Sequence, residues 1–119
     1  MINHRGPEFA ALLTDCVEGL RWAMQTDNDV LLYPASGTGG LEAVVANILC
    51  RGEKALFCSV GNFGKSWADI AATYGADVVR FDVPWGEALD PEDVDRLLAQ
   101  HPDVRSVFVT HNETSTGTI

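Results

Sequence analysis

The sequence predicts an α/β fold of three layers, in which helices cover both faces of a largely parallel sheet. Helix-spaced apolar segments alternate with short apolar runs along the whole chain, in the order αβαβαβαβ. Turns rich in Gly, Pro, Asn and Asp separate these segments. The 119 residues are 46% apolar and 21% charged, which is the composition of one soluble domain with a buried core.

Four segments have the apolar spacing of amphipathic helices. Two of them carry start signals, because Pro7 suits a first helical position and Asp90 stands as an N-cap before a proline. In the last helix, Val94, Leu97 and Leu98 are predicted to face the core. The four segments are residues 7–25, 39–50, 67–74 and the stretch that follows Asp90.

Four short apolar runs are predicted to be strands of the sheet. They are residues 29–33, 54–60, 77–83 and 104–110. We expect the first run to be buried and to end at Pro34. In sheets of this kind ligands bind beyond the carboxyl ends of the strands, so the loops that follow the runs are candidate binding loops.

A turn of small residues, Ser36-Gly37-Thr38-Gly39-Gly40, follows the first run and leads into a predicted helix. The first turn of a helix has unpaired N–H groups and a partial positive charge, and two hydroxyls add further donors. The glycines let a phosphate approach the backbone. The same residues could serve only as an N-cap, and they match neither a Walker loop nor a dinucleotide fingerprint.

Two further loops leave predicted strand ends with polar or aromatic groups. Asn62 and Phe63 follow the second strand, and His111-Asn112-Glu113-Thr114 follows the fourth. Each has a structural explanation by itself, Phe63 as a core residue and 111–116 as a hydrogen-bonded loop. Their joint placement with the Ser36-Gly37-Thr38 turn favours a single site at one edge of the sheet.

Charge and residue spacing argue against several kinds of partner. A net charge of −9 opposes binding to nucleic acid or to anionic membranes, but local dipoles can still hold a small anion. No apolar run is long enough to span a bilayer. Cys16, Cys50 and Cys58 are scattered, so we expect reduced, buried thiols in a cytoplasmic protein. Neither the cysteines nor the histidines have metal-ligand spacing, and no metal site is expected.

Three segments in this order carry a family resemblance. They are His4-Arg5-Gly6-Pro7-Glu8-Phe9, Tyr33-Pro34-Ala35-Ser36-Gly37-Thr38-Gly39 and His111-Asn112-Glu113-Thr114-Ser115-Thr116-Gly117. Together they resemble the serine–glyoxylate and alanine–glyoxylate aminotransferases, which are class-V aminotransferases of the pyridoxal-phosphate (PLP) fold-type I group. The resemblance runs the length of the chain and implies PLP as cofactor.

The resemblance implies a role for each matching residue. Ser36, Gly37 and Thr38 match the turn that binds the PLP phosphate. Phe63 matches the aromatic residue that stacks on the pyridine ring, and Thr114 matches a hydroxyl residue near the ring's phenolic oxygen.

The N-terminal segment Asn3, His4 and Arg5 matches a region near the active-site entrance and the subunit interface. The full-length enzyme is accordingly expected to be a homodimer. A peroxisomal rather than cytoplasmic location stays open, because the signal for it would lie at a C-terminus beyond these residues.

The resemblance also implies that residues 1–119 are only the first part of the large, cofactor-binding domain, without its C-terminal part or the small domain. Transamination requires a Schiff-base lysine, a carboxylate for the pyridinium nitrogen and an arginine for the substrate carboxylate. In the family these lie beyond the last motif, and neither Lys54 nor Lys65 matches the lysine. We therefore expect no catalytic residue here and no turnover by this chain alone.

In the family, the first predicted strand is separated from the other three by strands that come later in the sequence. Without those later strands, apolar strand edges would be left open here.

The implied reaction moves an amino group from L-serine or L-alanine to glyoxylate and gives glycine. One alternative is an α/β module that binds a phosphorylated small molecule without chemistry. Another is a different PLP enzyme of the same fold, such as a cysteine desulfurase, although no cysteine here lies in a recognisable reactive loop.

Overall fold

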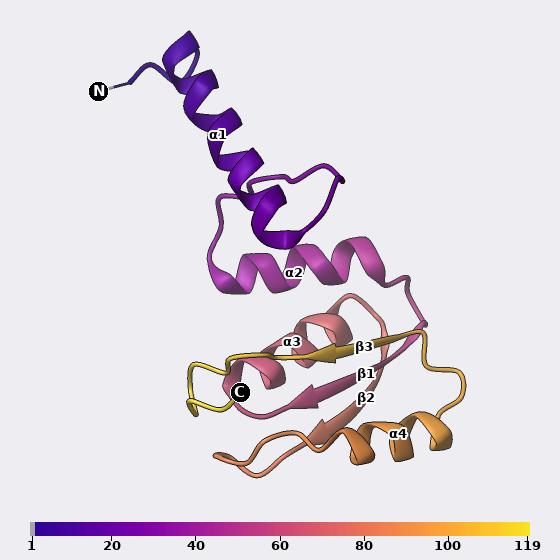
Figure 1. Cartoon of the computed structure of the whole chain (residues 1–119). Coiled ribbons are helices and arrows are strands. Elements are labelled where there is room, and N and C mark those ends of the chain that lie inside the picture. The colour runs from indigo at the N-terminus through magenta and orange to yellow at the C-terminus, as the bar shows by residue number, and fades with distance from the viewer. Residues whose placement is uncertain (1) are drawn as a thin grey trace. The chain divides into compact units, whose positions relative to one another are not determined.

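The computed structural model describes residues 2–119, which divide into two compact units between Pro34 and Ala35. The first unit contains one helix, and the second contains all the remaining helices and strands. In chain order they are α1 (Pro7–Met24), α2 (Gly37–Ile48), β1 (Lys54–Ser59), α3 (Asn62–Thr73), β2 (Asp77–Asp82), α4 (Pro91–Gln100) and β3 (Ser106–Val109) (Figure 1).

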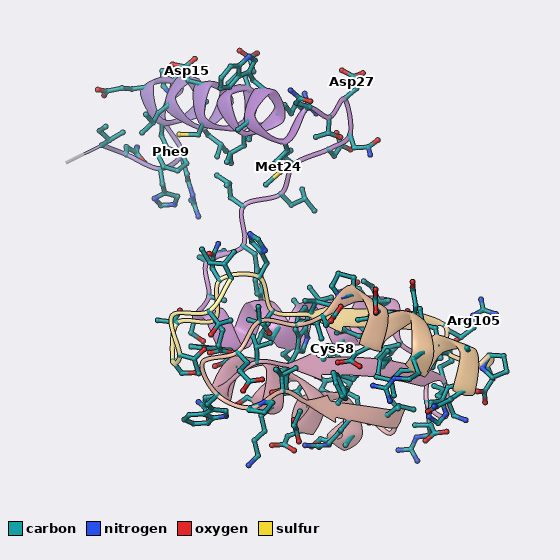
Figure 2. All side chains as sticks on the ribbon, turned by 60° about the horizontal axis from the view of Figure 1, so that its bottom comes forward. Phe9, Asp15, Met24, Asp27, Cys58 and Arg105 are labelled. Atoms are coloured by element: carbon teal, nitrogen blue, oxygen red, sulfur yellow. The ribbon has the colours of Figure 1, made fainter. Side chains whose placement is uncertain are left out.

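Helix α1 confirms the amphipathic helix predicted at residues 7–25. Pro7 stands at its start, and Gln25 ends it in the left-handed conformation with φ 49°. Phe9 and Asp15 project from opposite sides of the helix (Figure 2). Within this unit no residue between Pro7 and Met24 is buried, and Trp22 is 83% exposed.

The predicted strand at residues 29–33 is wrong. This segment has no regular secondary structure, and Leu31 is 88% exposed although it was expected to be buried. A strand forms only where a neighbouring strand supplies partners for its N–H and C=O groups. Within residues 2–119 no strand pairs with this run. The apolar composition therefore indicates a tendency to form a strand, but no strand of the described residues pairs with this run.

The sheet has the strand order β2-β1-β3, and both pairings are parallel. The chain passes from β1 to β2 through α3, then back across β1 to β3 through α4. Because parallel crossovers are right-handed, two crossovers in opposite directions put their helices on opposite faces of the sheet. Figure 1 shows α3 and α4 on opposite sides of the strands. The three-layer α/β prediction is confirmed.

The core lies between the sheet and the helices α2 and α3. Phe57 of β1 and Phe108 of β3 are paired in the register, and their rings stack with centroids 4.4 Å apart. Trp67 of α3 meets both rings edge-on, with its centroid 6.3 Å from Phe57 and 5.0 Å from Phe108. Its indole Nε1 donates a hydrogen bond of 3.0 Å to the carbonyl of Leu41, which ties α2 to α3.

Two helices begin earlier than predicted. Helix α2 begins at Gly37 rather than Gly39, directly after the Ser36 cap. Helix α3 begins at Asn62 rather than near Trp67, so residues predicted as a loop form its first turn. Both shifts move the candidate binding residues from loops into helix N-termini.

The opposite face of the sheet is covered less completely. The apolar residues of α4 that were predicted to face the core are partly buried, and none between Pro91 and Gln100 is fully buried. Cys58 in β1 is buried within the sheet (Figure 2), but Cys16 and Cys50 are exposed, which corrects the expectation of three buried thiols. Burial raises the pKa of the Cys58 thiol to about 11. Within residues 2–119, none of the helices has the length and apolarity to cross a membrane.

The stacked rings predict a large stability loss for Phe57→Ala. Phe57 is 2% exposed, so the substitution leaves a cavity and should lower the free energy of unfolding by about 3–5 kcal/mol. Urea unfolding measures this change. Trp85→Ala is the matched control, because Trp85 is 68% exposed and its loss should change stability by no more than about 0.5 kcal/mol. Equal effects of the two substitutions would contradict the assigned core.

Candidate active site

The loop that follows β3 lies at the carboxyl edge of the sheet. This loop folds back on itself, with the N–H of Glu113 donating to the carbonyl of Thr118 at 2.9 Å. The hydroxyl of Thr116 donates to the carbonyl of Val60 at 3.1 Å. This hydrogen bond joins the loop to the residue that follows β1. The contact agrees with the prediction that the loops after the strands lie close together.

Glu113 connects this loop to the first turn of α3. Its side chain is among the most deeply buried of the described residues, and the residue is 1% exposed. Carboxylate Oε2 accepts hydrogen bonds from the N–H groups of Phe63 at 3.0 Å and Gly64 at 3.2 Å. Carboxylate Oε1 accepts from the Ser115 N–H at 3.2 Å and from its hydroxyl at 2.6 Å. The Asn62 N–H donates to Ser115 Oγ at 2.9 Å.

Glu113 lies in a loop that the sequence indicates as a candidate, but no role is predicted for it from the sequence. The partner amide of Phe63 lies 50 residues away in sequence, which no local pattern can indicate. One signal was present: Gly61, at the N-cap of α3, has no side chain with which to cap the helix. A capping group for α3 therefore had to come from elsewhere in the chain.

The surroundings of Glu113 favour its charged form. Burial raises the pKa of this carboxyl, but hydrogen bonds from the Ser115 hydroxyl and from three backbone N–H groups lower it by more. The pKa therefore lies below its ordinary value, and the group is ionised at neutral pH. The carboxylate faces the partial positive charge at the helix N-terminus, which stabilises it further.

The N-termini of α2 and α3, both at this edge, differ in the hydrogen-bond donors that they have available for a ligand. In α3 the amides of Asn62, Phe63 and Gly64 all have acceptors in the β3 loop. In α2, Ser36 Oγ accepts from Gly39, while the amides of Gly37 and Thr38 are first-turn donors without an intrahelical acceptor. An anionic ligand therefore meets open donors at α2 and an internal carboxylate at α3.

Phe63 lies beside the first turn of α2. A methyl group built on Gly37 would be 3.9 Å from Cε1 of the Phe63 ring, which is van der Waals contact. The two helices are fixed to each other by Trp67, as described, and by the Tyr74 hydroxyl, which donates to Glu42 Oε1 at 2.7 Å. The structure thus brings the predicted phosphate turn and the predicted stacking residue together.

The remaining predicted residues have different positions. Thr114 is exposed on the β3 loop and helps to line a hollow of about 200 Å³. Asn3, His4 and Arg5 belong to the first unit, where they form an exposed turn before α1. In that turn the Arg5 N–H donates to Asn3 Oδ1 at 3.0 Å. Within the second unit, the structure brings together residues of the α2 turn, α3 and the β3 loop.

The two lysines of the chain, Lys54 and Lys65, lie outside the group of residues that the structure brings together at this edge. Lys54 begins β1 and therefore lies at the amino edge of the sheet, opposite the candidate site. Its ammonium is 2.6 Å from Asp103 and 3.5 Å from Asp77, and the hydrogen bond with Asp103 raises its pKa. Lys65 is exposed on α3.

The tight packing around Gly61 predicts that a side chain there is not tolerated. A methyl group at Gly61 would be 2.5 Å from Glu113 Cγ and 2.6 Å from Ser115 Oγ, although the backbone conformation suits any residue. Gly61→Ala should therefore lower the free energy of unfolding by about 1–3 kcal/mol in urea unfolding. Gly40→Ala is the control, because open space surrounds Gly40 in α2 and alanine should raise stability by about 0.5–1 kcal/mol. A neutral Gly61→Ala would contradict the packing.

The lowered pKa of Glu113 predicts acid-sensitive stability. Because the unfolded carboxyl takes up a proton at a higher pH than the folded one, its contribution is complete above about pH 4.3 and declines as the pH falls through the folded value. The stability difference between the parent protein and Glu113→Gln should therefore be larger at about pH 6 than at about pH 3. Urea midpoints at both pH values test this, and a difference that is independent of pH would contradict it.

Comparisons with known proteins place these features in a family. The family model described as aminotransferase class-V matches residues 1–119. An uncharacterised aminotransferase of Methanocaldococcus jannaschii is 40% identical over 98% of this chain and 30% of that protein. The serine–glyoxylate aminotransferase of Methylorubrum extorquens is 36% identical over 97% of this chain and 29% of that protein.

Solved structures agree with these sequence matches. The alanine–glyoxylate aminotransferase from Nostoc sp. superposes with a TM-score of 0.84 at 35% identity, covering 99% of this chain and 32% of that one. The pyridoxamine–pyruvate aminotransferase from Mesorhizobium loti superposes with a TM-score of 0.90 at 29% identity, covering 99% of this chain and 30% of that one. The chain thus spans about 30% of the length of these relatives. It belongs to the class-V aminotransferase family.

Proposed function

We propose that this chain provides the phosphate-binding turn and the ring-stacking residue of a PLP-dependent aminotransferase that uses glyoxylate as amino acceptor. One observation carries the proposal. Of the N-termini of α2 and α3 at the carboxyl edge, that of α3 is closed by Glu113, whereas that of α2 has open donors beside the Phe63 ring. Family membership supports the reaction class, and several relatives bear names with glyoxylate as a substrate.

The residues present fit PLP. The amides of Gly37 and Thr38, together with the Thr38 hydroxyl, offer donors to a phosphate at the positive end of α2. The Phe63 ring lies within van der Waals reach of Gly37, so one ligand that carries both a phosphate and an aromatic ring can contact both. A phosphorylated ligand without an aromatic ring would leave the Phe63 ring with nothing to stack on. PLP carries both the phosphate and the ring.

The roles of the chain's residues follow from that placement. When bound, PLP supplies an electron sink for the α-carbon of the amino acid. The first turn of α2 holds the phosphate, and Phe63 covers one face of the ring and fixes its plane. By family resemblance, Thr114 donates or accepts a hydrogen bond at the ring's phenolic oxygen. These residues bind and orient the cofactor, and none of them moves a proton at the reacting carbon.

In this proposal residues 1–119 are the first part of the large domain of the aminotransferase. Lys54 and Lys65 are unsuitably placed for a Schiff base, so the Schiff-base lysine lies outside these residues. By family resemblance, the carboxylate for the ring nitrogen and the substrate-binding arginine lie outside them as well. Residues 1–119 by themselves are accordingly inactive. L-serine or L-alanine is the proposed amino donor, and the enzyme is a cytoplasmic homodimer with Asn3, His4 and Arg5 near the subunit interface.

Residues 1–119 alone should give no glycine from L-serine and glyoxylate in the presence of PLP. The physical reason is that the described site contains no lysine to carry the proton transfer. Amino-acid chromatography of the reaction mixture measures glycine. The serine–glyoxylate aminotransferase of Methylorubrum extorquens serves as positive control under the same conditions. Sustained glycine formation by residues 1–119 would contradict the proposed division of the site.

Thr38→Glu should weaken PLP binding at least about tenfold in the protein expressed from its complete coding sequence. The added carboxylate repels the phosphate, whereas the same charge at a helix N-terminus leaves fold stability unchanged or higher. Thr38→Gln is the control of equal size. Absorbance titration with PLP, and with pyridoxal as the ligand lacking phosphate, separates the two effects: only PLP should respond to the charge. Equal binding of PLP and unrelated phosphorylated compounds would instead favour the non-catalytic binding module.

A further inference from the structure

Glu113 is the buried charged residue that the proposed mechanism leaves without a role. It does not belong to the open first turn of α2, and its carboxylate is directed at α3. Yet the residues that it joins are those expected to contact PLP, since Phe63 donates to it and Thr114 follows it in the chain. Its carboxylate therefore lies at the junction of two groups of cofactor contacts.

We propose that Glu113 is a positioning residue, whose carboxylate holds Phe63 and the Thr114 loop in the geometry that binds PLP without itself touching the cofactor. This inference rests on the proposed PLP site. Glu113 then contributes to the affinity for PLP, because it preorganises the residues that contact the cofactor.

The hydrogen bonds around the carboxylate show why a charge is needed here. The two oxygens are acceptors in every hydrogen bond of the side chain. Oε2 accepts from the Phe63 and Gly64 amides, and Oε1 accepts from the Ser115 N–H and hydroxyl and, at 3.3 Å, from the Phe63 amide. The Ser115 oxygen itself accepts from the Asn62 amide, so its hydrogen remains directed to Glu113. Both oxygens of the Glu113 carboxylate therefore face hydrogen-bond donors.

Glutamine has nearly the same shape but cannot replace this pattern. Its amide has one oxygen and one NH₂ group, so in either orientation the NH₂ faces backbone N–H donors of α3 or of Ser115. Aspartate keeps the charge but is shorter by one methylene, and it cannot reach both sets of donors. Glu113→Gln therefore removes the junction while leaving volume and burial almost unchanged.

Loss of the junction lowers stability, as predicted above, and in the folded protein it also releases Phe63. The Phe63 amide is the second donor of α3, and its ring lies beside Gly37 in α2. When that amide is released, the distance between the Phe63 ring and the Thr114 loop is no longer fixed. Binding PLP must then order both segments, and the free-energy cost of that ordering reduces affinity.

The test compares PLP binding by the parent protein, Glu113→Gln and Phe57→Leu, each expressed from its complete coding sequence and studied at a temperature where all three are folded. Phe57→Leu controls for lost core stability without touching the site. We expect Glu113→Gln to raise the PLP dissociation constant about tenfold and to change the circular dichroism of bound PLP, whereas Phe57→Leu does neither. Hydrogen exchange at the Phe63 and Gly64 amides should also accelerate in Glu113→Gln.

The outcomes separate this inference from the proposed function. A parent protein that binds no PLP overturns the proposed function. A parent that binds PLP while Glu113→Gln binds it equally well, with the same spectrum, overturns the positioning role alone. If Glu113→Gln does not fold, Ser115→Ala replaces it, because that change removes the hydroxyl between Oε1 and the Asn62 amide. It should shift affinity and spectrum in the same direction by a smaller factor, and no shift would overturn the role.

Discussion

The buried carboxylate of Glu113 joins the two connections that leave the sheet at its carboxyl edge. Helix α3 follows β1, and the Glu113 loop follows β3, so the contact links segments that the topology only places near each other. A helix N-terminus buried without partners for its amides is costly, since each unpaired donor loses about 1–3 kcal/mol. The loop from β3 removes that cost for α3, and the first turn of α3 in return fixes the loop.

The parts of the fold that depend on local sequence were predictable. The runs that became β1 and β2 are apolar, bounded by turns, and pair with neighbours inside the chain. Helix α4 was found from its Asp90 cap, whose side chain does accept from Glu92 N–H. The run at residues 29–33 has the same apolar character, but a strand also needs a neighbour, and a single segment contains no information about one.

The start of α3 was missed for the same physical reason. The stretch around Gly61 and Gly64 looks like a turn because it has no capping side chain of its own. The cap comes from Glu113, and Gly61 is small because that carboxylate and Ser115 fill the space above it. A glycine that the sequence places in a turn is thus a point of close approach in the structure. The candidate site could therefore be located at the edge of the sheet from the sequence, but its contacts could not.

The chain's net charge of −9 and its proposed anionic ligand are compatible because the binding field is local. Each helix N-terminus at this edge offers the same partial positive charge. The protein's own carboxylate occupies one of them, and that carboxylate is a fixed, fully hydrogen-bonded negative group. It makes α3 unattractive to a second anion, which supports the proposal that the open amides of α2 bind the phosphate. The position of Glu113 therefore fixes the backbone of Phe63, the proposed stacking residue, and leaves α2 as the proposed phosphate site.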